Sequence, residues 1–72
     1  MTRDELNTAL LAAHGRGDGT AISACYAEAA KREGDNAARA FLLTQAYIFA
    51  LEAGSQEAHA LRQDLVALGA ER

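Results

Sequence analysis

The sequence predicts an all-α protein of four helices, arranged as two antiparallel hairpins in one domain over residues 1–72. Three observations support this fold class. Apolar residues recur at helical spacing, glycines divide the chain into four segments, and no segment shows the alternation or the β-branched enrichment of a strand. Half of the residues are apolar, but 18 of them are Ala, so the composition favours helix and supplies few large side chains for a core.

Glycines followed by helix-capping residues mark the boundaries between these segments. Such a pair combines a residue that tolerates left-handed backbone with a side chain that can cap the next helix. Three pairs divide the chain: Gly17-Asp18, Gly34-Asp35 and Gly54-Ser55. We therefore expect helices near 3–14, 20–33, 36–53 and 56–68.

The first, second and fourth segments each carry one apolar stripe. Segment 3–14 opens with a capping box, since Glu5 can reach back to the backbone N–H of Thr2. Its stripe is thin and comprises Leu6, Leu10 and Ala13. The second stripe comprises Ile22, Cys25, Tyr26 and Ala29, and the stripe of the fourth segment comprises Ala58, Leu61, Leu65 and Leu68.

Segment 36–53 differs because it is apolar around nearly its whole circumference. One face holds Leu43, Tyr47, Ala50 and Leu51, and the adjacent face holds Leu42, Ala46, Phe49 and Ala53. A third face adds Phe41 and Ile48. Three neighbouring helices cannot easily enclose such a helix, so we expect some of Phe41, Ile48 and Phe49 to stay uncovered. Exposed apolar patches of this kind usually mark a partner surface.

The two hairpins also follow a known repeat pattern. Their turns recur at a spacing close to roughly 34 residues. The matching residues are Gly17-Asp18, Tyr26 and Ala29 in the first hairpin and Leu43, Thr44 and Tyr47 in the second. On these residues the chain resembles a pair of tetratricopeptide repeats. A closed four-helix bundle, in which the first and fourth helices would touch, is the alternative packing.

The resemblance implies a concave partner-binding surface lined by the first helix of each hairpin. Carried over by position, this surface comprises Asn7, Leu11, His14, Ala38, Phe41, Leu42, Gln45, Ile48 and Phe49. Family members that grip a terminal carboxylate use Lys, Arg and Asn here, and only Asn7 is of that type. The resemblance therefore favours an apolar groove for an amphipathic helix or for a second copy of the chain.

Catalytic and metal-binding groups are sparse. Cys25 is the only cysteine, which excludes an internal disulfide and a multi-cysteine metal site. His59 has no His or carboxylate four residues along its helix, and His14 has only Asp18, which lies across the helix end. We expect no metal, no cofactor and no enzymatic activity. The alternative is a ligand-binding or catalytic bundle that uses His14 with Asp18, or the Cys25 thiol.

The charge balance and the hydropathy narrow the partners to proteins. Seven Lys and Arg against ten Asp and Glu give a net charge of -3, which argues against non-specific binding to nucleic acid. The longest uncharged stretch, 40–51, is shorter than the about 20 residues of a membrane span. With no signal-peptide pattern at residue 1 and a single cysteine, we expect a cytoplasmic protein. The Arg and Ala content indicates a bacterial source.

Together these observations predict a non-catalytic protein-interaction module. We expect it to form a homodimer, or to dock onto a larger protein, through the exposed side of the third helix. The reason is that two repeats bury a marginal core, whereas about three are normally needed. A small helical subunit without repeat packing is the other interpretation of the same pattern.

Overall fold

The computed structural model describes residues 1–69, and this range contains four α-helices and no strand. The helices are α1 (Arg3–Arg16), α2 (Gly19–Arg32), α3 (Asn36–Glu52) and α4 (Glu57–Ala67). The predicted all-α fold is confirmed, and each helix end differs from the prediction by no more than two residues. The last part of the predicted domain, residues 70–72, lies outside the described range.

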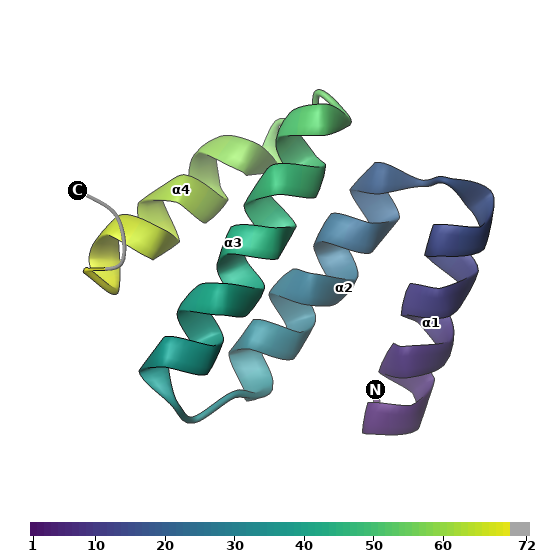
Figure 1. The fold of residues 1–72 in the computed structure, drawn as a ribbon, viewed down its shortest axis with the longest axis horizontal. Helices are drawn as coiled ribbons and strands as arrows, with labels where there is room; N and C mark the ends of the chain where they lie inside the picture. The colour runs from purple at the N-terminus through teal and green to yellow at the C-terminus, as the bar shows by residue number, and fades with distance from the viewer. Residues whose placement is uncertain (70–72) are drawn as a thin grey trace.

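The helices lie side by side in chain order, and successive helices run antiparallel (Figure 1). α1 packs against α2, α2 against α3, and α3 against α4. α1 and α4 stand at opposite ends of the array, so the closed bundle is not the observed packing. The Cα atoms span 33 × 27 × 14 Å, which makes the molecule thin in one direction. Each of the two central helices, α2 and α3, is therefore covered mainly by the helices on either side of it.

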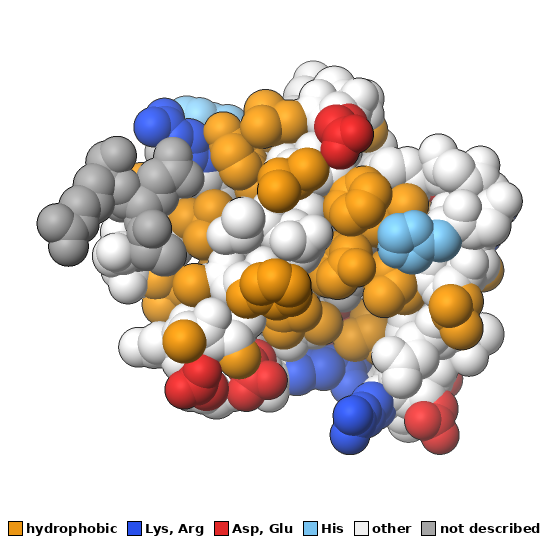
Figure 2. Space-filling model, viewed as in Figure 1, with side chains coloured by type: hydrophobic (Ala, Val, Ile, Leu, Met, Phe, Trp, Pro, Cys, Tyr) orange, Lys and Arg blue, Asp and Glu red, His pale blue; other side chains and the backbone are white. Residues whose placement is uncertain are grey.

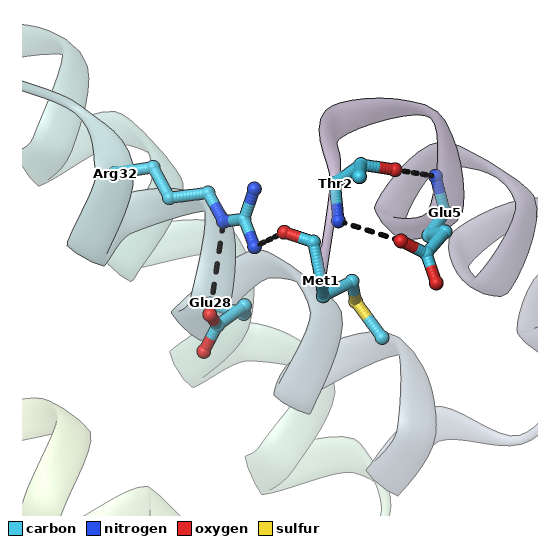
Figure 3. Close-up of polar contacts among 5 residues, drawn as sticks. All are labelled: Met1, Thr2, Glu5, Glu28 and Arg32. Carbon is cyan, nitrogen blue, oxygen red and sulfur yellow. Dashed lines mark hydrogen bonds and ion pairs between the residues drawn. The ribbon is translucent and has the colours of Figure 1, made fainter.

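Side-chain caps explain where three of the helices begin. The predicted capping box of α1 is present: the Thr2 hydroxyl accepts the Glu5 N–H at 3.1 Å, and the Glu5 carboxylate accepts the Thr2 N–H at 2.9 Å (Figure 3). Asp18 and Asp35 cap α2 and α3 by accepting the N–H three residues further on, at 3.1 and 2.8 Å. Each bond satisfies a backbone donor that has no partner within its helix.

Two of the predicted boundary pairs differ in detail from the structure. Gly17 and Gly54 adopt left-handed backbone, with φ of 66° and 67°, but Gly34 does not. α2 instead ends in extended backbone at Glu33, whose carbonyl oxygen accepts two hydrogen bonds from the Arg39 guanidinium, at 2.7 and 3.1 Å. Arg39 thus satisfies the carbonyl of the residue at which α2 ends.

The start of α4 also departs from the prediction. The N-cap position is Gln56 rather than Ser55, and the Gln56 side chain makes no capping hydrogen bond. The Ser55 hydroxyl still accepts the Glu57 N–H at 3.2 Å. The carbonyl of Ser55 accepts the Ala58 N–H at 3.3 Å, so the turn tightens before the regular helix begins.

Small side chains form the contact between α2 and α3. Ala46 and Ala50 are fully buried on α3, and Ser23 is buried opposite them on α2. The Ser23 hydroxyl donates to the Ala46 carbonyl at 2.7 Å, a bond that joins the two helices directly. At the first residue of α2, a Cβ added to Gly19 would lie 3.2 Å from the Ala53 Cβ. The two backbones therefore approach closely because no large side chain separates them.

The main core cluster is built by α2, α3 and α4. Its buried members are Ala30, Leu43, Ala46, Ala50, Ala58, Leu61 and Leu65. α1 contributes no residue to this cluster and buries only Leu6 and Ala13. Burial of apolar area is the main stabilising term in folding, so α1 is the helix whose packing against the rest of the molecule is weakest.

A polar contact supplements the small apolar contact of α1. The Arg32 guanidinium, in the last turn of α2, donates to the carbonyl oxygen of Met1 (Figure 3). Arg32 also pairs with Glu28 one turn earlier, with 3.7 Å between Nε and the carboxylate oxygen. The beginning of α1 is thereby joined to the end of α2.

Replacing Ser23 tests how closely α2 packs against α3. Ser23→Ala removes the hydrogen bond to the Ala46 carbonyl, and we expect it to lower the free energy of unfolding by about 1 kcal/mol. Ser23→Val also adds bulk between the two backbones, and we expect a larger loss of about 1–3 kcal/mol. Urea denaturation followed by circular dichroism measures both, with Thr20→Val at an exposed position of α2 as the control. A valine that is tolerated as well as alanine would contradict the close packing.

The capping box predicts a pH dependence of stability. The hydrogen bond from the Thr2 backbone, with a smaller contribution from the Thr2 side chain, lowers the pKa of the Glu5 carboxyl from its ordinary value of 4.5. The unfolded chain therefore binds the Glu5 proton more readily than the folded chain does. Stability from this group is complete above pH 4.5 and is lost as the pH falls through the lower folded value.

Glu5→Gln keeps an acceptor for the Thr2 N–H but cannot ionise. We expect the wild type to be more stable than this variant at neutral pH, and the difference to narrow as the pH falls below 4.5. Thermal unfolding at a series of pH values measures the difference. A gap that stays constant across that range would show that the carboxylate charge makes no contribution to the cap.

Candidate protein-binding surface

The side of α3 that faces away from the core carries large apolar side chains. Phe41, Ile48 and Leu51 keep 62%, 41% and 53% of their surface exposed. Exposure of Phe41 and Ile48 agrees with the expectation from the sequence. Leu51, grouped from the sequence on one face with Leu43 and Ala50, is exposed, whereas those two residues are buried. Leu51 follows Ala50 by one residue, which rotates it about 100° around the helix and past the edge of the buried face.

One more residue completes this face. Thr44 is exposed and lies three residues after Phe41 and four before Ile48. Residues spaced by three and four positions share one side of a helix. We name the set Phe41, Thr44, Ile48 and Leu51 the outer stripe of α3. From residue 40 to residue 51, α3 has no charged side chain.

An aromatic cluster beside the outer stripe joins α1, α2 and α3. Phe49 stacks on Tyr26 of α2, with ring centroids 5.8 Å apart and planes at 9°. The His14 ring of α1 meets Phe49 edge-on, at 5.7 Å and 85°. Phe49 is therefore half-buried rather than uncovered. Through these contacts the last turn of α1 is held against α3 as well as α2.

The predicted site residues differ in their exposure. On α1, Asn7, Leu11 and His14 are exposed, and Leu11 is 73% exposed. On α3, Phe41 and Ile48 belong to the outer stripe, whereas Leu42 packs against the core cluster and Ala38, Gln45 and Phe49 are half-buried. The structure brings His14 and Phe49 into contact. The site predicted from the sequence does not include Leu51 and Thr44, although they lie three and four residues from Ile48.

One broad face of the molecule is predominantly apolar. Figure 2 shows hydrophobic side chains along α3 and between α3 and α1, with charged side chains mostly near the edge of this face. Exposed large apolar residues also occur elsewhere, including Val66 on α4. Scattered exposed apolar residues are normal, but a contiguous group over one helix is typical of a binding surface.

Two residues of the catalytic alternative, His14 and Asp18, have other partners. Asp18 caps α2 through Oδ1, and its Oδ2 lies 3.6 Å from the Arg16 guanidinium. His14 packs against Phe49. Cys25 is a free thiol in a half-buried position. Within residues 1–69, no group of three His, Cys, Asp or Glu side chains is placed to hold a metal ion.

No known protein family, curated protein or solved structure matches this chain. The resemblance to tetratricopeptide repeats stays a prediction, based on the residues that suggested it. Over the described residues, none of the helices has both the length and the apolar character that crossing a membrane requires.

The contact between His14 and Phe49 predicts energetic coupling between α1 and α3. In a double-mutant cycle of His14→Ala and Phe49→Leu, we expect an interaction energy of about 0.5–1.5 kcal/mol. Asn7→Ala, at an exposed position two turns from His14, should combine additively with Phe49→Leu. Chemical denaturation of the single and double variants measures both cycles. Additive effects for the His14 pair would show that the rings do not interact in solution.

Proposed function

We propose that this chain is a non-catalytic protein-binding module whose partner packs on the outer stripe of α3. The observation that carries the proposal is the exposure of Phe41, Ile48 and Leu51 on a helix whose opposite side is buried. Covering apolar surface is favourable by roughly 25 cal/mol per Å². An apolar partner surface would supply that cover.

The absence of charge along the stripe supports a partner that is also apolar. A partner that covered residues 40–51 would remove no charged side chain of α3 from water. Desolvation of unpaired charges is costly, so their absence lowers the cost of association. The apolar side of an amphipathic helix fits such a surface, because its residues recur at the same spacing of three and four.

The wider proposal includes location and architecture. A cytoplasmic location and a bacterial source are proposed from the single cysteine and from the Arg and Ala content. The repeat-like architecture is proposed from the matched residues and is supported by the packing of α3 between α2 and α4. The edges of the surface would then include Leu11 and His14 of α1.

Photo-crosslinking tests the proposed function. A photoreactive phenylalanine analogue at Phe41 preserves the aromatic side chain and places the reactive group on the outer stripe. In cells that express the chain at its natural level, we expect the analogue to crosslink to a polypeptide and the second substitution Ile48→Glu to abolish that product. The same analogue at Val66, an exposed apolar position of α4, is the matched control.

Two results would overturn the proposal. One is that Phe41 yields no more polypeptide crosslinks than Val66 does. The other is that crosslinks at Phe41 persist unchanged in the Ile48→Glu background. Circular dichroism of the purified variants establishes that each retains the helical content of the wild type, so that a loss of crosslinks reports the surface and not the fold.

A further inference from the structure

We propose that α1 is a lid. It opens at the turn before α2 while α2, α3 and α4 stay folded, and its opening uncovers apolar surface beside the outer stripe. Opening of α1 is independent of the proposed function, because it requires no partner on α3. The division of the core, the glycines of the turn and the position of the His14 ring support this lid.

The apolar core divides the molecule between α1 and the other three helices. Among residues 1–69, every buried member of the main cluster belongs to α2, α3 or α4, and so do the half-buried side chains packed against it. α1 buries Leu6 and Ala13 outside that cluster, and its Leu11 is 73% exposed. Detachment of α1 therefore breaks no contact within the main cluster. Helices that share so little with the core open at a lower free energy than the whole chain unfolds.

The turn between α1 and α2 provides a weak point for opening. Gly15 lies in the last turn of α1, and a Cβ added there would meet no atom within 4 Å. Its φ is not positive, so neither the packing nor the backbone requires a glycine at this position. A glycine inside a helix lowers the stability of that helix relative to alanine. The end of α1 can thus separate at Gly15 without breaking a packed contact of that residue.

A contact at each end of α1 closes the lid. At the beginning, the Arg32 guanidinium donates to the Met1 carbonyl, and at the end the His14 ring meets the edge of Phe49. Arg32 keeps its ion pair with Glu28 when Met1 is withdrawn, and the exposed Met1 carbonyl can accept from water. Opening therefore leaves neither polar group buried and unpaired, which is the costly outcome for a hydrogen bond.

The lid covers a hollow between the α1–α2 turn and the end of α3. The hollow has a volume of about 370 Å³, and His14, Ile22 and Phe49 are among its lining residues. Withdrawal of His14 removes one wall of this hollow and frees the edge of the Phe49 ring. Phe49 directly follows Ile48 of the outer stripe, so the uncovered area adjoins the apolar side of α3. Opening of α1 would thus enlarge the apolar surface of the molecule.

Amide hydrogen exchange of the full chain under native conditions tests whether α1 opens separately. α1 has 14 residues, a length at which an isolated helix is marginal in water, so its amides exchange when it detaches. We expect the most protected amides of α1 to exchange at least about tenfold faster than those of α3. Their rates should also rise less steeply with added urea, because opening exposes less surface than unfolding does. Equal protection and equal urea dependence in both helices would overturn the lid.

Two variants separate opening from unfolding of the whole chain. Leu61 belongs to the main cluster, which stays intact in the open state, so Leu61→Val should speed exchange in α3 by about fivefold and leave exchange in α1 unchanged. An equal acceleration in α1 would contradict separate opening. Gly15→Ala strengthens the end of α1 and should slow exchange in α1 by about fivefold. An unchanged rate in that variant would overturn the assignment of the weak point to Gly15.

A charge under the lid tests what opening uncovers. Leu6→Asp places a carboxylate at a buried position of α1 and should hold the lid open. We expect the helical circular dichroism to fall by the share that α1 contributes, and binding of an apolar fluorescent dye to increase, while α3 amides stay protected. Asn7→Asp adds the same charge at the next, exposed residue and should match the wild type. Loss of protection in α3 as well as α1 of Leu6→Asp would overturn the lid.

Discussion

The close contact between α2 and α3 is the constraint on which the rest of the structure depends. Ser23, Ala46 and Ala50 are small enough for the two backbones to approach, and the Ser23 hydroxyl joins them through the Ala46 carbonyl. This contact uses alanine where many helical proteins use leucine. Leu43 is the buried large apolar residue of α3, whereas Phe41, Ile48 and Leu51 are exposed, so the packed interior of a single chain is modest. Small residues thus form the contact between α2 and α3, and larger apolar side chains of α3 stay exposed on the outer stripe.

The order of the helices determines how that interior is shared. α3 packs between α2 and α4, and these three helices supply the whole main cluster. α1 is attached to α2 by a small apolar contact, to the end of α2 by Arg32, and to α3 by the edge of the His14 ring. A chain of neighbour contacts leaves broad faces open, whereas a closed bundle would direct every helix toward a common axis. The outer stripe of α3 lies on one of these open faces.

Local patterns in the sequence were sufficient to predict the four helices. They were less sufficient to predict which side chains the packing between helices buries. The Thr2 and Glu5 pattern, and Asp18 and Asp35, predicted helix starts because capping depends on a few neighbouring residues. The exposure of Phe41 and Ile48 followed from counting apolar faces against available neighbours.

Features that depend on distant residues were not predictable in this way. Ser23 is a polar interruption of the α2 pattern until Ala46 is placed against it. At the end of α2, Gly34 is not left-handed, and Arg39 donates to the Glu33 carbonyl. Phe49 was one of three residues of which some were expected to stay uncovered, and a ring from each of two other helices partly covers it. Leu51 is exposed although it was grouped with the buried Leu43 and Ala50, because it lies at the border between two faces, where a rotation of one residue decides burial.

The turn between α1 and α2 has a practical consequence for dissecting the molecule. The cap of α2 is the side chain of Asp18, which precedes that helix, and Gly17 completes the end of α1 with a left-handed residue. The C-cap of α1 and the N-cap of α2 are therefore separate, adjacent residues, and a cut between them leaves each helix with its own cap. A truncation made directly before Asp18 would preserve every member of the main cluster and remove the His14 ring from Phe49. The shortened chain would isolate the three-helix unit that presents the apolar face and separate its properties from those of the first helix.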